Sequence, residues 1–273
     1  MKKQKVYYYH DMKNDDFATT NIETVKLPDD YKYIKRNFLY NFVKMFLRLV
    51  VYPIIYLILK IGYGISFKNR RVLRKVKKQG YFLYGNHTNY MMDAYNPHII
   101  PLPLQAEVVV NPDAVSIKGI KVIVEMLGAF PVPTSMKGMK NFCDSIEILI
   151  KKKHVITIYP EAHIWPCYTD IRPFGTESFH YPVNTNSPCF AFTNIYKKRI
   201  IPFIKYPKVV TYIDGPFYPD LNLGKKERIN KLRDEVYNAM KKRVDENPKY
   251  EYRKYVYVED PSMSNAKNRQ KNI

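Results

Sequence analysis

Cysteine is scarce in this chain, and no secretory signal is visible. The 273 residues include three cysteines, which lie far apart at Cys143, Cys167 and Cys189. An odd number of distant cysteines without a CxxC pair supports neither a disulfide framework nor a zinc site. The N-terminal residues lack the apolar stretch of a signal peptide. We therefore expect the folded domain to stay inside the cell, on the reducing cytosolic side.

Glycine and proline, with 10 and 19 residues, are too scattered to indicate low complexity, and hydrophobic residues make up 46% of the chain. This composition and length predict one main α/β domain, a mixed sheet flanked by helices, with terminal attachments. The expected segments are an N-terminal arm at 1–30, a membrane-associated helical hairpin at 31–67, the α/β domain at 68–258 and a disordered tail at 259–273. We expect neither end to carry chemistry.

Acidic residues are absent between Tyr31 and Met92, a stretch that contains thirteen Lys and Arg. The whole chain has a formal net charge of +20, which favours anionic partners such as phospholipid surfaces, nucleic acid or acidic carrier proteins. Each basic residue near an anionic leaflet contributes about 1 kcal/mol to membrane attraction. The concentration of charge in this stretch therefore points to an anionic membrane surface.

A long hydrophobic run is also missing, since the longest uncharged run within 38–67 is the eleven residues Leu49–Leu59. A membrane-spanning helix needs roughly 20 predominantly apolar residues. A polar stripe recurs at helical spacing, at Asn37, Asn41, Lys44 and Arg48. We expect a helix lying in the membrane interface, kinked or ended by Pro53 and followed by a second apolar piece. The alternatives are a buried core hairpin beside a solvated basic helix, and a tilted span with snorkelling basic side chains.

No GxSxG nucleophile motif occurs, and no serine or cysteine belongs to the turn at 85–89. That turn follows a predicted buried strand at Tyr81–Tyr84 and precedes a helix expected to stop near Pro97. It places His87 at the carboxyl end of a strand, with Asp93 about one helical turn further on. A carboxylate on one imidazole nitrogen fixes the tautomer and leaves the other nitrogen free to accept a substrate proton. The alternative is an ordinary hydrogen-bonded turn.

The segment from Gly85 to His87, together with Asp93, resembles the HxxxxD signature of the glycerolipid acyltransferases, typified by 1-acylglycerol-3-phosphate acyltransferase. Three later segments resemble further blocks of that family in its order, at 128–133, 158–163 and 187–192. Here five residues instead of four separate the His from the Asp. The third block has Ala162, His163 and Ile164 where glycine, threonine and arginine are usual.

The resemblance implies transfer of a fatty acyl group from a thioester or acyl-phosphate donor to a hydroxyl of a lysophospholipid-like acceptor, foremost 1-acylglycerol-3-phosphate. His87 would deprotonate the acceptor and Asp93 would orient His87. The donor would be acyl-CoA, acyl carrier protein or acyl phosphate, and no metal or redox cofactor is required. Acyl carrier protein is then a candidate partner and nucleic acid is not. The expected location is the cytoplasmic face of the cell membrane, as a peripheral or monotopic protein in phospholipid synthesis.

Substrate-binding candidates lie in these blocks or close after them: Asn86, Gly128, Thr134, Lys137, Glu161, His163 and Arg172. Backbone N–H groups at Asn86–Asn89 or Gly128 would stabilise the oxyanion. Because the usual basic residues of the second and third blocks are missing, Arg172 is expected to bind a phosphate through its planar guanidinium. The alternatives are a turn cap for Glu161, a packed side chain for His163 and a surface position for Arg172.

Two other classes of function remain open on the sequence. The charge and the 25 tyrosines suit a non-enzymatic binder of anionic lipid or nucleic acid, which would need basic and aromatic residues on one exposed face. A lipid hydrolase would use the same histidine with water in place of the acceptor alcohol. The remaining periodicity predicts a helix around 139–150, a strand at 155–159 and a late amphipathic helix at 225–244.

Overall fold

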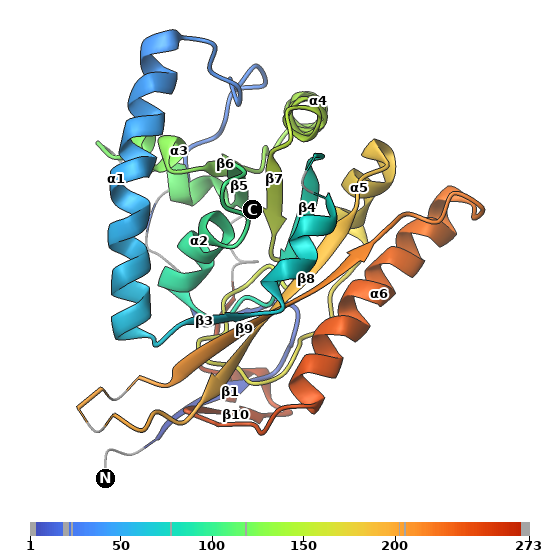
Figure 1. Ribbon diagram of the computed structural model, residues 1–273. Coiled ribbons are helices and arrows are strands. Elements are labelled where there is room, and N and C mark those ends of the chain that lie inside the picture. Colours follow the sequence, from blue (N-terminus) through green and yellow to red (C-terminus); the bar gives the residue numbers. More distant parts are fainter. Residues whose placement is uncertain are drawn as a thin grey trace.

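The fold is built on a seven-stranded mixed sheet, shown in Figure 1. The computed structural model describes residues 4–18, 22, 24–76, 78–117, 119–201, 203, 204 and 206–268. The strand order is β3-β9-β8-β4-β7-β5-β6, and only the β8–β9 pair is antiparallel. The strands are β3 (Ser66–Lys68), β4 (Tyr81–Gly85), β5 (Ala106–Val110), β6 (Ala129–Pro131), β7 (Val155–Ile158), β8 (Cys189–Lys197) and β9 (Lys208–Phe217). The predicted mixed sheet flanked by helices is confirmed.

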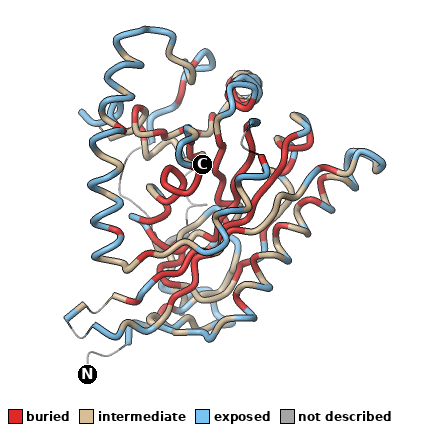
Figure 2. The backbone as a smooth tube through the Cα atoms, in the orientation of Figure 1, coloured by how far each residue is buried: buried red, intermediate tan, exposed pale blue. Residues whose placement is uncertain are grey.

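Helices cover both faces of this sheet. One face packs against α4 (Met136–Lys151), α5 (His180–Thr185) and α6 (Lys225–Asp245), and the other packs against α1 (Phe38–Gly62) and α2 (Tyr90–Ile99). A short helix, α3 (Lys121–Met126), leads into β6, and 3-10 turns occupy 70–76, 112–115, 177–179 and 261–263. Figure 2 shows the strands buried between these layers. The predicted helices at 139–150 and 225–244 are confirmed, as are the strands that begin at Tyr81 and Val155.

The predicted hairpin at 31–67 is wrong, because α1 is one helix of 25 residues that runs through Pro53. Contacts on both sides of the proline hold the helix on the domain. Before it, Arg48 binds Glu107 and the backbone of Met126, and the Tyr52 hydroxyl donates to the Leu127 carbonyl; after it, the Leu59 side chain is fully buried. Lys44 and Arg48 of the polar stripe therefore face the protein, and the apolar face points outward.

The outward face of α1 is strongly apolar, with Phe38 83% exposed and Leu49 71% exposed. In length and composition α1 could cross a membrane, and it is the one helix in the described part of the chain that passes this test. Figure 2 shows most of the helix exposed. The inner face of α1 packs on the domain, while its outer face presents an exposed apolar surface.

Both ends of the chain are more ordered than the sequence predicts. In the arm, β1 (Lys5–Tyr9) pairs in parallel with β10 (Arg253–Tyr257), and β2 (Asp15–Asp16) pairs with β11 (Lys267–Asn268). The predicted disorder of the tail is therefore wrong for 259–268, while 269–273 lie outside the described residues. Tyrosine side chains stack across the first pair, as in Tyr7 on Tyr255, so aromatic packing organises termini that have no hydrophobic periodicity.

Candidate active site

The predicted contact between His87 and Asp93 is present at the carboxyl end of β4. His87 Nδ1 lies 2.8 Å from Asp93 Oδ2, which leaves Nε2 as the free ring nitrogen. Asp93 stands in the first turn of α2 and is 2% exposed. Burial raises the pKa of its carboxyl above 3.8, an effect opposed by the His87 contact and by hydrogen bonds from the backbone of Asn89 and Thr88. The geometry matches an imidazole held by a carboxylate for proton transfer.

Tyr159, which the sequence did not single out, supports this pair from β7. Its ring stacks on His87 with 4.3 Å between centroids, and its hydroxyl donates to the backbone carbonyl of Asp93 at 2.7 Å. That carbonyl lies four residues before Pro97, which has no N–H to bond it. The helix was expected to stop near Pro97, but α2 continues to Ile99 because the tyrosine replaces the missing donor.

Glu161 and Arg172 form a buried ion pair that supports the turn carrying His87. Glu161 accepts hydrogen bonds from the backbone of His87 and of Arg172, both at 3.0 Å, and its carboxylate lies 3.3 Å from the Arg172 guanidinium. Arg172 also donates to the carbonyls of Met12 and His163. Both side chains have no exposed surface, so the substrate-binding prediction for this pair is corrected: neither can reach a ligand in this structure.

His163 lies at the edge of the site with a partner from the N-terminal arm. His163 Nδ1 is 3.4 Å from Asp16 Oδ2, and the Asp16 side chain is buried. Asp16 is fixed by β2, by its hydrogen bond from the Ala18 backbone and by the hydrogen bond from the Trp165 indole to the neighbouring Asp15 carbonyl. The arm therefore reaches the site, contrary to the expectation from the sequence, where nothing connects residue 16 to residue 163.

Both histidine and aspartate pairs, His87 with Asp93 and His163 with Asp16, line one cavity of about 470 Å³. Its polar wall contains His87, Asp93, Tyr159, Asp16 and His163, and its apolar wall is formed by Val108, Val110, Val124, Leu127, Val132 and Ile158. His98 lines it too, and burial lowers the pKa of that imidazole to about 3, so the ring is neutral at pH 7. Among the described residues that line the cavity, none is serine, threonine or cysteine.

The other predicted substrate-binding residues lie elsewhere. Asn86 is buried and exchanges hydrogen bonds with the Asn194 backbone, which joins β4 to β8, so its predicted substrate role is corrected. Thr134 and Lys137 are exposed around the start of α4 and do not line the cavity. Gly128 has a φ of +106°, and a Cβ there would lie 2.4 Å from the His98 ring, so its glycine is required for packing.

Three of the backbone donors expected to form an oxyanion hole are already engaged. The N–H of His87 donates to Glu161, that of Asn89 donates to Asp93, and that of Gly128 donates to the Glu125 carbonyl. These hydrogen bonds orient the turn after β4, and the oxyanion prediction is corrected for these three groups. Among the described residues, no cluster of three or more His, Cys, Asp or Glu side chains could hold a metal ion.

The fold is shared with a solved structure. The chain is similar to the 1-acyl-sn-glycerophosphate (LPA) acyltransferase PlsC from Thermotoga maritima, with a TM-score of 0.53 over 78% of this chain and 91% of that chain. The sequences are 13% identical, so the similarity establishes the fold. No protein-family model matches the chain, and the comparison with curated proteins finds no match either.

Proposed function

We propose that this protein is an acyltransferase that uses His87 to transfer a fatty acyl group directly to an acceptor hydroxyl. The observation that carries the proposal is the 2.8 Å contact between His87 and a buried carboxylate, in a cavity with an apolar wall. The shared fold with an LPA acyltransferase supports it. No hydroxyl or thiol of serine, threonine or cysteine among the described lining residues offers a covalent route, so the acceptor itself is the nucleophile.

In the proposed step, His87 Nε2 takes the proton of the acceptor hydroxyl as its oxygen attacks the donor carbonyl. The new ester bond forms as the thioester or acyl-phosphate bond breaks, and the imidazolium returns the proton to the leaving group or to solvent. Asp93 stabilises the imidazolium and keeps Nε2 directed at the acceptor. Acyl-CoA, acyl carrier protein and acyl phosphate all satisfy this balance, and no redox cofactor enters it.

The proposed acceptor is a lysophospholipid, foremost 1-acylglycerol-3-phosphate, and the proposed location is the cytoplasmic face of the cell membrane. The apolar wall suits a fatty chain, and the outward apolar face of α1 suits a membrane surface. The test is incubation of purified protein with each labelled donor and a panel of lysolipids, with products resolved by mass spectrometry. Free fatty acid as the sole product would replace the proposal by a lipid hydrolase.

His163 is proposed to hold the phosphate of the acceptor, with Asp16 as its positioning residue. His163→Gln is expected to raise KM for a phosphorylated acceptor by about tenfold, since hydrogen bonds to charged groups are the stronger ones. Asp16→Asn should raise it less, and the double variant should match His163→Gln. Steady-state kinetics check this prediction, with a lysolipid that lacks phosphate as the control. An equal change in KM for both acceptors would contradict the phosphate role.

The apolar face of α1 is expected to hold the protein on membranes. Replacing Phe42, Phe46 and Leu49 by serine should weaken vesicle binding at least about 100-fold, because each buried side chain of this size contributes about 1.5–3 kcal/mol. Vesicle flotation measures the change, and Ile200→Ser with Leu221→Ser removes exposed apolar surface elsewhere as the control. Binding to neutral vesicles that is unchanged by the triple substitution would contradict the docking role of α1.

A further inference from the structure

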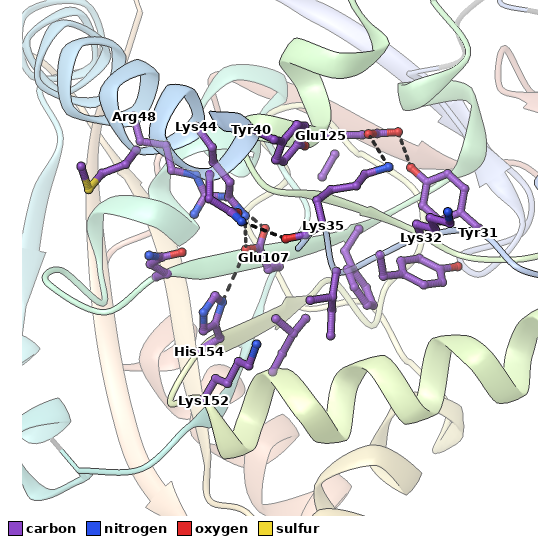
Figure 3. A pocket seen from close by; sticks show the side chains of 18 residues that line it. Tyr31, Lys32, Lys35, Tyr40, Lys44, Arg48, Glu107, Glu125, Lys152 and His154 are labelled. Atoms are coloured by element: carbon purple, nitrogen blue, oxygen red, sulfur yellow. Dashed lines mark hydrogen bonds and ion pairs between the residues drawn. The ribbon is translucent and has the colours of Figure 1, made fainter. Parts of the chain in front are cut away.

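A second pocket, of about 390 Å³, lies at the end of the sheet where the parallel strands begin. His87 lies at the other end, after the last residue of β4. It is bounded by the segment 31–35, the first turns of α1, the start of β5 and the end of α4, as Figure 3 shows. Since β4, β5 and β7 run in parallel, β5 begins at the end of the sheet opposite to the one where β4 leads into the His87 turn. The two pockets therefore belong to different sites.

A buried carboxylate forms the floor of this pocket. Glu107 on β5 is 5% exposed and lies 3.1 Å from Lys44 Nζ and 3.0 Å from Arg48 Nη2. Figure 3 shows both basic side chains reaching from α1 toward it. Burial lowers the pKa of Lys44, although the ion pair with Glu107 opposes this shift. A second carboxylate, that of Glu125, lies 3.5 Å from Lys35 Nζ and accepts a hydrogen bond from the Tyr31 hydroxyl.

Positive charge exceeds negative charge in the pocket lining. Five cationic side chains line it, Lys32, Lys35, Lys44, Arg48 and Lys152, against the two carboxylates of Glu107 and Glu125. Lys32 and Lys152 have exposed side chains, and within the described ranges neither makes an ion pair. Because the two carboxylates satisfy only part of this charge, an anion entering the pocket would meet lysines that are free to bind it.

The mouth of the pocket adjoins the apolar face of α1. Met45 lines the pocket and is itself exposed, and Phe38, Phe42 and Phe46 continue the exposed apolar surface along the helix. An anion bound here would therefore sit where a membrane lipid places its head group when its chains lie along α1. A soluble anion would gain nothing from this apolar surface.

We propose that this pocket binds the phosphate-bearing head group of a membrane lipid and thereby fixes how α1 is seated in the membrane. Lys32 and Lys152 would donate hydrogen bonds to the phosphate oxygens. Lys44 and Arg48 would offset the negative charge of Glu107 at the floor of the pocket. The inference concerns the pocket where the parallel strands begin, far from His87, and does not depend on acyl transfer. Inorganic phosphate shares the chemistry, so the experiment separates the two sources.

The test compares two double variants that remove the same charge. Lys32→Gln with Lys152→Gln alters the pocket, whereas Arg36→Gln with Lys60→Gln removes exposed charge near the two ends of α1 without touching the pocket lining. Binding is measured by flotation with vesicles of phosphatidylcholine alone, with added phosphatidic acid, or with added fatty acid. On phosphatidic acid vesicles, the pocket variant should lose at least about tenfold more affinity than the control variant.

The same two variants should behave alike on fatty acid vesicles, because a carboxylate there offers charge without a phosphate. Equal losses on phosphatidic acid vesicles would show attraction by net charge alone and overturn the proposal. Binding of inorganic phosphate to the parent protein without vesicles, lost in the pocket variant while that variant still binds phosphatidic acid vesicles like the control, would assign the pocket to free phosphate and overturn the lipid assignment. Circular dichroism confirms that both variants are folded.

Discussion

The His87→Ala variant is expected to lose acyl transfer by a factor between about 100 and 10,000, the range that a positioned general base contributes. The chain should stay folded, because the histidine ring is partly exposed at the cavity and its backbone contacts do not depend on the side chain. The same loss should appear with every acyl donor that the parent protein accepts, because the acceptor proton must be removed whichever leaving group the donor carries.

Asp93→Asn should lose most of the activity as well, through a different defect. An amide in place of the carboxylate no longer stabilises the imidazolium, and it can hydrogen-bond the wrong tautomer of His87. The Asn89 backbone N–H and His87 Nδ1 both contact Asp93 Oδ2, at 2.8 Å each. With the amide oxygen at that position, the turn keeps both contacts and loses only the charge that stabilises the imidazolium. With the amide nitrogen there, the Asn89 N–H loses its acceptor and His87 is held in the wrong tautomer, so proton transfer fails in either case.

Initial rates with labelled donor and lysolipid acceptor check both substitutions. His180→Ala, at an exposed histidine on α5, is the matched control and should retain the parent rate. A folded His87→Ala protein with turnover within a few-fold of the parent would remove His87 from the mechanism.

The parts of this site that could be predicted from the sequence are those encoded within one short segment. His87 lies on the turn between β4 and α2, and Asp93 lies in the first turn of α2, so their short separation in the sequence brings them together. The same holds for the buried faces of α4 and α6, where a period of 3.6 marks residues such as Ile146 and Leu232.

The supporting contacts could not be predicted because they join distant segments. Asp16 reaches His163 only because β1 and β10 pair and hold the arm beside the loop after β7. Likewise, Pro97 reads as the end of a helix unless the Tyr159 hydroxyl is known to bond the Asp93 carbonyl. In the second case a tertiary hydrogen bond overrides the local preference of proline to end a helix.

The contacts of Arg172 differ from the phosphate contact expected from the sequence. The guanidinium was expected to bind a phosphate because the usual basic residues of the motif are absent. Instead it lies over the Trp165 ring at 4.9 Å and pairs with Glu161, which in turn holds the His87 backbone. Its effect on catalysis is therefore expected to pass through the position of the catalytic turn.

Arg172→Ala is expected to lower the free energy of unfolding by about 3–5 kcal/mol, because it leaves the Glu161 carboxylate buried without its counter-charge. Combining Arg172→Met with Glu161→Gln should cost less than the sum of Arg172→Met alone and Glu161→Gln alone, since the double change leaves no unpaired charge. Urea unfolding of the parent protein and these three variants gives the coupling, and Arg172→Ala is measured beside them. Activity at a temperature where all are folded should fall equally for phosphorylated and non-phosphorylated acceptors. A stable Arg172→Ala protein with a raised KM for the phosphorylated acceptor alone would restore the phosphate-binding role.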